Sequence, residues 1–361
     1  MTIKVRSKIV NGASEIVINA AIVGFGKSGQ KIHAPLLDLT EGIELAAVVS
    51  RSAPDIIPGR QSVQVVRSIN ELLDLESIDL VIITLPNHLH YSTAKKALEN
   101  GKHVVVDKPF TVTAGESDSL IGLAAENEKL LSVFQNRRLD GDFLTIKKLI
   151  DEDAVGKITE FESNFNRFRK ELREDAWKEK DLPGSGILYD LSPHLIDQTV
   201  ELFGLPKSLY ADVRSQRGGE ADDWFEINFY YDGFTAKLRA GMLVLDETPR
   251  FILRGDTGSF VKYGFDTQED ELSKGEHLRS SEWRRESAEN YGELRKIRGG
   301  KISSEQIETI PGDYPAFYSN IVDSIQNSTE LLVKPEEARD VISLIELCLK
   351  SAKEGRVLEC D

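Results

Sequence analysis

The sequence predicts an α/β protein with an N-terminal doubly wound parallel sheet and a C-terminal α+β domain built on a large, open, mostly antiparallel sheet. Between residues 17 and 134, short apolar runs alternate with helix-like stretches, which implies parallel strands joined by right-handed crossovers. Beyond residue 139, several extended segments follow one another with little helix between them. We therefore divide the chain into residues 1–139, with an extension at 1–16, and residues 140–361.

Composition limits the classes of partner. A chain of 361 residues with 40% hydrophobic content is large enough for two domains. Its formal net charge of -15 argues against a nucleic-acid partner and favours small molecules. No apolar run approaches the roughly 20 residues of a membrane span, and the N-terminus lacks the apolar core of a signal peptide. Cys348 and Cys360 alone indicate neither disulfides nor a cysteine metal site, so we expect a cytoplasmic protein.

The first strand leads into a glycine-rich turn. After an extension in which Asn11-Gly12 predicts a small hairpin, residues 17–23 are almost continuously apolar. The turn consists of Gly24, Phe25, Gly26, Lys27, Ser28 and Gly29, and a helix-like stretch continues to residue 39. In this G-x-G-x-x-G pattern the glycines let backbone amides approach a pyrophosphate, and the helix N-terminus favours its charge. We therefore predict that the first domain binds a dinucleotide, as a Rossmann domain does.

The end of the second strand indicates which dinucleotide binds. The strand covers residues 44–49 and is followed by Ser50, Arg51 and Ser52, where an NAD site usually carries Asp or Glu for the ribose 2′-hydroxyl. A guanidinium and two hydroxyls can bind a 2′-phosphate, which a carboxylate would repel. We predict NADP rather than NAD. The alternative, in which Arg51 is an ordinary surface residue and Asp55 binds the ribose of NAD, stays open.

The alternation continues with helices at residues 69–73, 91–100 and 114–128 and strands at 80–85, 102–106 and 130–134. In open parallel sheets, ligands bind at the carboxyl ends of the strands. We therefore place on the cofactor side the residues that end the strand at 80–85, namely Leu85, Pro86, Asn87 and His90. His88 and His90 are candidates for contact with cofactor or substrate, and the alternative is that at least one is a polar loop residue.

The strand at 102–106 ends abruptly at Asp107-Lys108-Pro109. Residues 104–106 are all valine, which suits a strand covered on both faces, and Pro109 lacks the amide needed to continue the ladder. Lys108 therefore lies at the edge of the sheet where ligands bind. We assign both Asp107 and Lys108 to the cofactor side of the sheet as well. An isolated Lys-Pro is more often a solvated turn, so other residues must decide its role.

The second domain begins with a helix ending near residue 150. Extended segments are predicted at residues 157–168, 208–214, 224–231, 235–242, 250–253 and 259–263. Asp232-Gly233 is a strong hairpin signal between two of them. We predict one long charged loop without chemistry at residues 264–300, and helices at 314–326 and 335–352, the last of which packs back toward the first domain.

Asp190 and His194 form the other candidate site. They stand four residues apart, and an apolar helical face surrounds them in the sequence, so a continuous helix would bring them to one side. Pro193 leaves open a kink or a helix that starts with Ser192 as its cap. A carboxylate beside a histidine raises its basicity, as a general base for alcohol oxidation requires. The alternative is a helix surface pair or a core histidine; no third ligand for a metal presents itself.

Together these motifs resemble the glucose-fructose oxidoreductase, inositol dehydrogenase and rhizopine-catabolism (Gfo/Idh/MocA) family from about residue 18 to the last helix. The residues that carry the resemblance are Gly24-x-Gly26-x-x-Gly29, Pro86-Asn87-x-x-His90, Asp107-Lys108-Pro109 and Gly186-x-x-x-Asp190-x-x-x-His194. Ser50-Arg51 and Asn136-Arg137-Arg138 most resemble the branch of NADP-dependent scyllo-inositol dehydrogenases. Asp107 stands where the family usually has Glu.

The resemblance implies an NADP-dependent oxidoreductase that transfers hydride between the nicotinamide and a hydroxyl or carbonyl carbon of a cyclic polyol or sugar. It implies catalytic roles for Lys108, Asp190 and His194, with His194 as proton acceptor, and substrate contacts from these three and Arg137. It also implies a homodimer or homotetramer assembled through the second domain's sheet. Two alternatives stay open: a non-catalytic dinucleotide-binding regulator, and a reductase of a nucleotide-linked sugar, a ketosugar or a tetrapyrrole.

Overall fold

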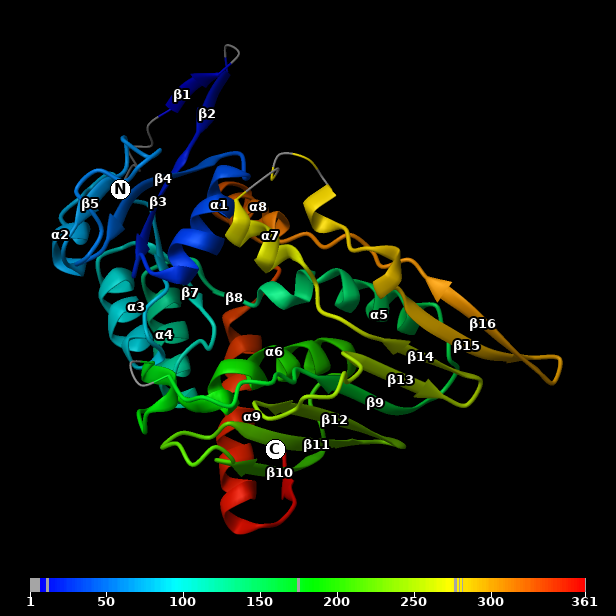
Figure 1. Cartoon of the computed structure of the whole chain (residues 1–361). Coiled ribbons are helices and arrows are strands. Elements are labelled where there is room, and N and C mark those ends of the chain that lie inside the picture. Colours follow the sequence, from blue (N-terminus) through cyan, green and yellow to red (C-terminus); the bar gives the residue numbers. More distant parts are fainter. Residues whose placement is uncertain are drawn as a thin grey trace.

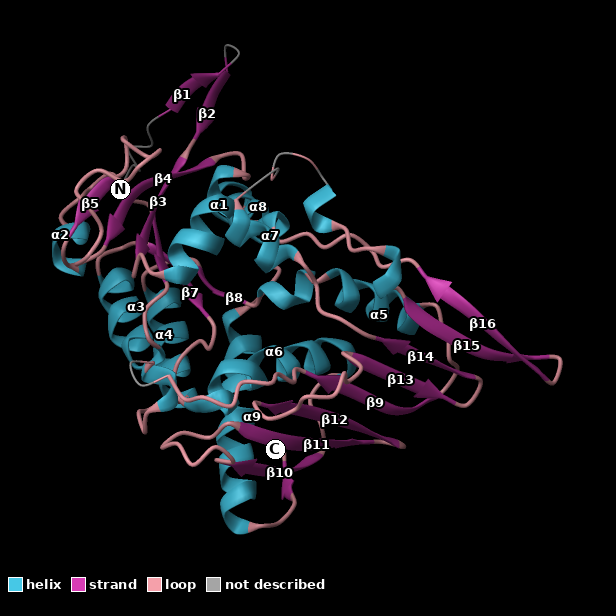
Figure 2. Ribbon diagram, viewed as in Figure 1, coloured by secondary structure: helices cyan, strands magenta, loops and turns pink. Residues whose placement is uncertain are grey.

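A computed structural model of the chain describes residues 7–10, 13–173, 176–275, 278, 280 and 282–360 (Figure 1). It contains a six-stranded sheet, a nine-stranded sheet and a separate hairpin of β1 (Ser7–Val10) and β2 (Ala13–Ile16). The hairpin pairs Val10 with Ala13, so it falls where the sequence predicts one, while the predicted Asn11-Gly12 turn lies outside the described residues. Figure 2 shows the two larger sheets as separate layers with helices between and around them.

The six-stranded sheet is parallel throughout, in the order β5-β4-β3-β6-β7-β8. Its strands are β3 (Ile18–Val23), β4 (Ile43–Val49), β5 (Gln64–Val66), β6 (Leu80–Ile83), β7 (His103–Asp107) and β8 (Leu131–Phe134). The strand order reverses between β3 and β6, which opens a crevice at their carboxyl ends. β5 is missing from the prediction because three residues are too short to produce a periodic signal.

Helices cover this sheet where the alternating pattern predicts them. They are the π-helical turn η1 (Gly29–His33), α1 (Ala34–Asp38), α2 (Ile69–Leu73), α3 (His90–Glu99) and α4 (Ala114–Glu126). The valines at 104–106 are completely buried in the middle of the sheet, as a strand covered on both faces requires. The predicted doubly wound parallel sheet is confirmed.

The second domain contains a mixed sheet in the order β16-β15-β14-β13-β9-β12-β11-β10-β17. Its strands, in chain order, are β9 (Ile158–Asn164), β10 (Ser208–Arg214), β11 (Trp224–Tyr231), β12 (Phe234–Gly241), β13 (Phe251–Gly255), β14 (Gly258–Lys262), β15 (Gly292–Arg298), β16 (Lys301–Ile307) and β17 (Leu358–Glu359). The pair β9 and β12 is parallel and the other neighbours are antiparallel, so the predicted mostly antiparallel sheet is confirmed.

The prediction of one long loop at residues 264–300 was wrong. This segment contains α7 (Gln268–Lys274), two short 3-10 turns and β15, and β15 forms a hairpin with β16 that extends from the sheet edge (Figure 1). The strands escaped detection because they are rich in charged residues, and the alternation expected of a half-buried strand is weak there. Leu294 is the buried side chain of β15.

Four helices complete the second domain: α5 (Gly141–Asp151), α6 (Gly186–Phe203), α8 (Pro315–Asn327) and α9 (Pro335–Glu354). α6 packs on β11 and β12, and it runs through Pro193, so it does not start at Ser192. α9 contacts α4 of the first domain as well as α6 and β10. The domain division at residue 139 stays a prediction. In the part of the chain that the structure describes, no helix is both long and apolar enough to span a membrane.

Candidate active site

A cavity of about 500 Å³ lies where the two domains meet. Its first-domain wall comes from the glycine turn and from the ends of β6, β7 and β8, represented by Ser28, Leu85, Pro86 and Lys108. Its second-domain wall includes Asp190 and His194 of α6. The topology therefore brings both candidate sites of the sequence into one cavity.

The glycine turn has the space that a dinucleotide needs. Gly24 has φ +100°, and a Cβ there would lie 2.9 Å from the carbonyl oxygen of Thr84. A Cβ at Gly29 would lie 3.0 Å from the carbonyl oxygen of Gly24, so these two glycines allow close packing of turn, helix and sheet. A Cβ at Gly26 would meet nothing within 4 Å. No packing within the described residues calls for a glycine at 26, whereas close approach of a pyrophosphate does.

Asp107 fastens the glycine turn to β7. Its carboxylate accepts a hydrogen bond of 2.7 Å from the Ser28 hydroxyl and lies 3.6 Å from Nε2 of His33. It also accepts the amide of Lys108 at 2.8 Å. Burial raises the pKa of Asp107, but the hydrogen bonds and charges of His33, Lys108 and Ser28 outweigh it and hold the pKa below its usual range. Asp107 is therefore an anion that positions the turn, and it also lines the cavity.

Lys108 and Asp190 connect the two domains. The ammonium donates to the main-chain oxygen of Asp190 at 2.6 Å and lies 3.2 Å from Oδ1 of its carboxylate. The same carboxylate accepts a second hydrogen bond, of 2.5 Å, from the ammonium of Lys178 in the turn η4 (Trp177–Glu179). Burial lowers the pKa of Lys108, with the nearby Lys178 adding to the effect and Asp190 opposing it. Burial raises the pKa of Asp190, but the two ammonium groups outweigh it, and the carboxyl stays ionised.

The predicted pairing of Asp190 with His194 needs correction. Both side chains line the cavity, but the carboxylate is bonded to Lys108 and Lys178, and Nδ1 of His194 has no hydrogen-bond partner within the described chain. Burial and the charges of Lys108 and Arg137 keep the pKa of His194 well below its usual value, against the attraction of Asp190. The imidazole is consequently neutral near pH 7, the state in which it accepts a proton.

Arg137 lies deeper in the wall than a simple substrate ligand would. Its guanidinium bonds to Asp140 at 3.0 Å and to Glu269 at 2.9 Å, and it stacks over the ring of Phe165 at 4.8 Å. Glu269 belongs to α7, inside the segment to which the sequence assigned no chemistry, and it lines the cavity. A single carboxylate in a helix with many charges gives no recognisable signal, so the sequence could not predict that Glu269 lines the cavity.

The end of β4 presents a guanidinium where an NAD site usually presents a carboxylate. Arg51 and Ser52 are exposed, and Arg51 has no acidic partner among the described residues. Asp55, the alternative ribose ligand, instead forms an ion pair with Arg67. Arg67 follows β5 and donates to the carbonyl oxygens of Ser50 and Ala53 at 2.8 and 2.7 Å, so it shapes this loop. The sequence did not reveal Arg67 because β5 itself was missed.

Two of the residues predicted beside the cofactor are held by the backbone. His90 has ring nitrogens 2.8 Å from the carbonyl oxygens of Pro109 and Leu85 and does not line the cavity. Burial lowers the pKa of His90, so the neutral ring donates a hydrogen bond to only one of these oxygens and supports the Lys108-Pro109 turn rather than facing a ligand. Asn87 does line the cavity, but its amide donates to the carbonyl oxygen of Gly184 at 2.7 Å and so joins the first domain to the loop before α6.

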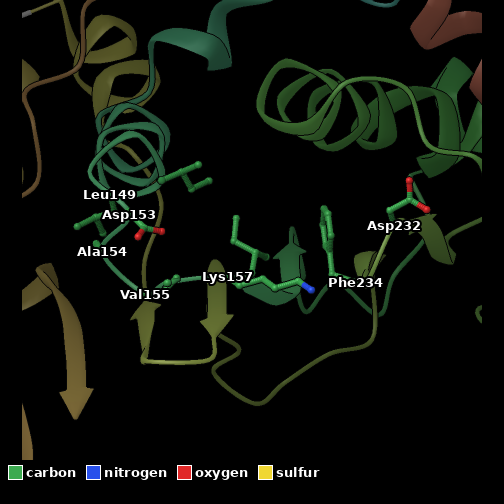
Figure 3. Close-up of a pocket in the computed structure, with 10 residues that line it drawn as sticks. Leu149, Asp153, Ala154, Val155, Lys157, Asp232 and Phe234 are labelled. Carbon is green, nitrogen blue, oxygen red and sulfur yellow. The ribbon is translucent and has the colours of Figure 1, made fainter. Parts of the chain in front are cut away.

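A second cavity, of about 340 Å³, lies at the end of α5 and is drawn in Figure 3. There Lys157 lies between a group that includes Leu149 and Asp153 and the pair Asp232 and Phe234. Within the described chain, none of its lining residues has a buried polar atom without a partner. Because it contains neither the glycine turn nor a histidine, we assign the chemistry to the cavity between the domains.

Known proteins place this arrangement in a family. Residues 18–135 match the model described as "Oxidoreductase family, NAD-binding Rossmann fold", and residues 147–360 match "Oxidoreductase family, C-terminal alpha/beta domain". The uncharacterized oxidoreductase YdgJ of Escherichia coli is 42% identical over 94% of this chain and 98% of its own. The scyllo-inositol 2-dehydrogenase (NADP(+)) IolW of Bacillus subtilis is 39% identical over 94% of this chain and 95% of its own.

Solved structures agree with the sequence matches. The structure of the oxidoreductase yvaA from Bacillus subtilis superposes with a TM-score of 0.93 at 38% identity and covers 97% of this chain and 100% of its own. The oxidoreductase YPO2259 from Yersinia pestis gives a TM-score of 0.90 at 39% identity, covering 96% of this chain and 97% of its own. The chain belongs to the Gfo/Idh/MocA family of NAD(P)-binding oxidoreductases.

Proposed function

We propose that this oxidoreductase uses NADP to oxidise a CH–OH group of a cyclic polyol or sugar, or to reduce the corresponding carbonyl. One observation carries the proposal: the ammonium of Lys108, directly after β7, and the neutral imidazole of His194 in α6 line the same cavity as the glycine turn. An alcohol dehydrogenation needs a group that takes the hydroxyl proton and a group that stabilises the oxygen while its charge develops. These two side chains supply both.

In the oxidation direction, His194 accepts the hydroxyl proton of the substrate, and Lys108 donates a hydrogen bond to the same oxygen. NADP held at the glycine turn and Arg51 would supply the acceptor for the hydride that leaves the carbon. Asp190 holds the Lys108 ammonium through the two contacts of 2.6 and 3.2 Å, so the donor is oriented before the substrate binds. In the reduction direction, the protonated His194 returns the proton. Arg137 contributes to substrate binding as part of the cavity wall.

The preference for NADP rests on the loop after β4. Arg51 is exposed and has no acidic partner in the described chain, so it is available to a 2′-phosphate, while the carboxylate of Asp55 is occupied by Arg67. Ser50, which accepts the amide of Ala53 at 3.1 Å, and Ser52 stand on either side of Arg51. The name of the relative from Bacillus subtilis, an NADP(+) enzyme, supports the same choice.

The test is a panel of inositols, aldoses and ketosugars assayed for NADP reduction at 340 nm, with NAD measured in parallel. Turnover of at least one polyol or sugar, faster with NADP, is the expected result. Tight NADP binding without turnover across the panel, including nucleotide-linked sugars and a tetrapyrrole in the reduction direction, would favour a non-catalytic regulator instead.

We also propose a homodimer or homotetramer that uses the open face of the nine-stranded sheet. Side chains on this face form a ladder of opposite charges, with Lys237 bonded to Glu160 at 2.6 Å and Arg239 bonded to Glu226 at 2.6 Å. A mixed polar face of this kind can pair with a second copy of itself. Light scattering during gel filtration tests this proposal, and a monomer at micromolar concentration would contradict it.

A further inference from the structure

The cavity carries more positive charge than the proposed reaction uses. Seven lysine and arginine side chains line it, against three carboxylates, in a protein whose net charge is -15. Two of these carboxylates, Asp190 and Glu269, are already engaged by Lys108, Lys178 and Arg137. Of the other four cations, Arg173 pairs with Glu179 and Lys27 belongs to the glycine turn, where the cofactor's phosphates are expected. A neutral polyol would therefore leave Arg167 and Arg169 without a counter-charge.

Arg167 and Arg169 are the unpaired cations on the second-domain wall. They belong to an extension of β9, in which the amides of Arg167 and Arg169 bond to the carbonyl oxygens of Gly241 and Met242 at 2.9 and 2.8 Å. Because side chains alternate along an extended segment, Phe165, Arg167 and Arg169 project to the same side. Neither guanidinium forms an ion pair within the described chain, although both line the cavity.

The surroundings of Arg167 place it at the substrate end of the cavity. Its guanidinium stacks over Phe165 at 4.9 Å, the same ring that Arg137 covers at 4.8 Å. Burial lowers the pKa of Arg167, the charges of Arg137 and Arg169 add to the effect, and Asp190 and Glu269 oppose it. Arg167 lines the cavity from the second domain, as Asp190 does, whereas the glycine turn lines it from the first domain. The cofactor's pyrophosphate and 2′-phosphate belong at the turn and at the end of β4.

Two buried polar atoms of cavity-lining side chains, one from each domain, also lack partners. They are Nε of Arg137 and Nδ1 of His194, and no other group of the described chain bonds to them. Burial of an unsatisfied polar atom is costly, but both atoms are closed off from the open cavity, so the case for an anionic ligand rests on Arg167 and Arg169.

We propose that the substrate is a polyol or sugar that carries an anionic group, a carboxylate or a phosphate, bound by Arg167 and Arg169 while its reacting hydroxyl faces Lys108 and His194. This inference rests on the proposed function and adds the substrate class to it. Arginine forks bind both carboxylates and phosphates through paired hydrogen bonds, so the shared chemistry is an oxyanion.

The experiment compares matched substrates that differ in one anionic group: myo-inositol with its 1-phosphate, and glucose with glucose 6-phosphate and with glucuronate. We expect kcat/KM to be higher for an anionic member by roughly 10- to 100-fold, the range of one or two charge-assisted hydrogen bonds. Arg167→Gln and Arg169→Gln should each remove most of the ratio of kcat/KM between the anionic and the neutral member, mainly by raising KM for the anionic one. Lys170→Gln, an exposed neighbour outside the cavity, is the matched control.

Several outcomes would overturn the inference without affecting the proposed function. These are equal or better turnover of the neutral members, an anionic preference that survives in the Arg167→Gln/Arg169→Gln variant, and variants that raise KM for NADP rather than for the substrate. If no member of either kind is turned over, the proposed function fails separately. Calorimetric titration of the anionic compounds into the NADP-loaded protein then decides: binding lost in the double variant supports the anion site, and no binding refutes it.

Discussion

The ammonium of Lys108 lies 2.6 Å from the main-chain oxygen of Asp190 and 3.2 Å from its carboxylate, so the residue that follows β7 is bonded directly to α6. This contact joins a strand of the nucleotide-binding domain to a helix of the second domain at the cavity itself. A lysine at a strand end is normally free to move in solvent. Here its position depends on both domains, which is what a donor aimed at a reacting oxygen requires.

Lys108→Ala should lower kcat by roughly 10²- to 10³-fold, because the developing negative charge on the substrate oxygen loses its donor. The dissociation constant for NADP, measured by fluorescence titration, should change by only a few fold, since Asp107 still holds the glycine turn. Lys95→Ala, which removes an exposed lysine paired with Glu99, is the control. Near-normal turnover of Lys108→Ala would remove the ammonium from the chemistry.

The pH dependence of oxidation should report His194. An ordinary imidazole has a pKa near 6.5, and burial together with Lys108 and Arg137 lowers that of His194. The base form is therefore fully present at pH 7, and kcat/KM for oxidation should stay flat until the pH falls below about 6.5. Reduction needs the protonated form and should gain as the pH falls. An acid limb of the oxidation profile above pH 7 would contradict this assignment.

His194→Gln is the companion measurement. It should abolish the acid limb and reduce kcat by roughly 10²- to 10⁴-fold, the usual contribution of a general base. His88→Gln changes a histidine that makes an edge contact with the Trp177 ring and should leave the profile intact.

Arg51→Asp should shift the cofactor preference toward NAD. The substitution removes the guanidinium that we assign to the 2′-phosphate and adds a carboxylate that repels it. Losing one such contact costs about 1.5 to 3 kcal/mol, or roughly 10- to 100-fold in kcat/KM for NADP. Arg60→Asp, at a guanidinium that already pairs with Asp38, is the control. An unchanged ratio of the two cofactors would show that the 2′-phosphate binds elsewhere.

The sequence predicted the parts of the fold whose signals are local. Continuous apolar runs such as residues 104–106 marked the buried strands, and the glycine turn marked the crevice beside them. β5 and the β15–β16 hairpin were missed for different reasons. β5 has three residues, and the hairpin lies at a sheet edge, where strand pairing holds it and few side chains are buried.

The candidate site was predictable only in part, because local patterns identify its residues but not their partners. Lys108 and His194 stand in recognisable patterns, but what each side chain bonds to depends on packing across the domains. The i, i+4 spacing suggested that Asp190 serves His194, whereas the fold brings two lysines within reach of that carboxylate. Glu269 and Arg167 belong to segments whose sequence is merely charged, so their place in the cavity depends on tertiary structure alone.

Arg138 should be the side chain whose loss destabilises the domain junction most. Its guanidinium bonds to both carboxylate oxygens of Asp197 at 2.8 and 2.7 Å and to Glu337 at 2.7 Å, and so joins α6 and α9 to the segment after β8. Arg138→Met leaves Asp197 buried without its counter-charge, which should cost about 3 to 5 kcal/mol of the free energy of unfolding in urea. Arg339→Met, at an exposed pair with Asp118, should cost about 1 kcal/mol or less.

The double variant Arg138→Met/Asp197→Leu separates an unpaired charge from lost packing. The double variant contains neither the guanidinium nor the carboxylate, so no unpaired buried charge destabilises the folded state. Most of the free energy of unfolding that Arg138→Met loses should therefore return. If the double variant is as unstable as Arg138→Met, the guanidinium acts mainly through its contacts with α9. A loss below about 1 kcal/mol for Arg138→Met alone would mean that the junction is held by the packing of α9 on α4 instead.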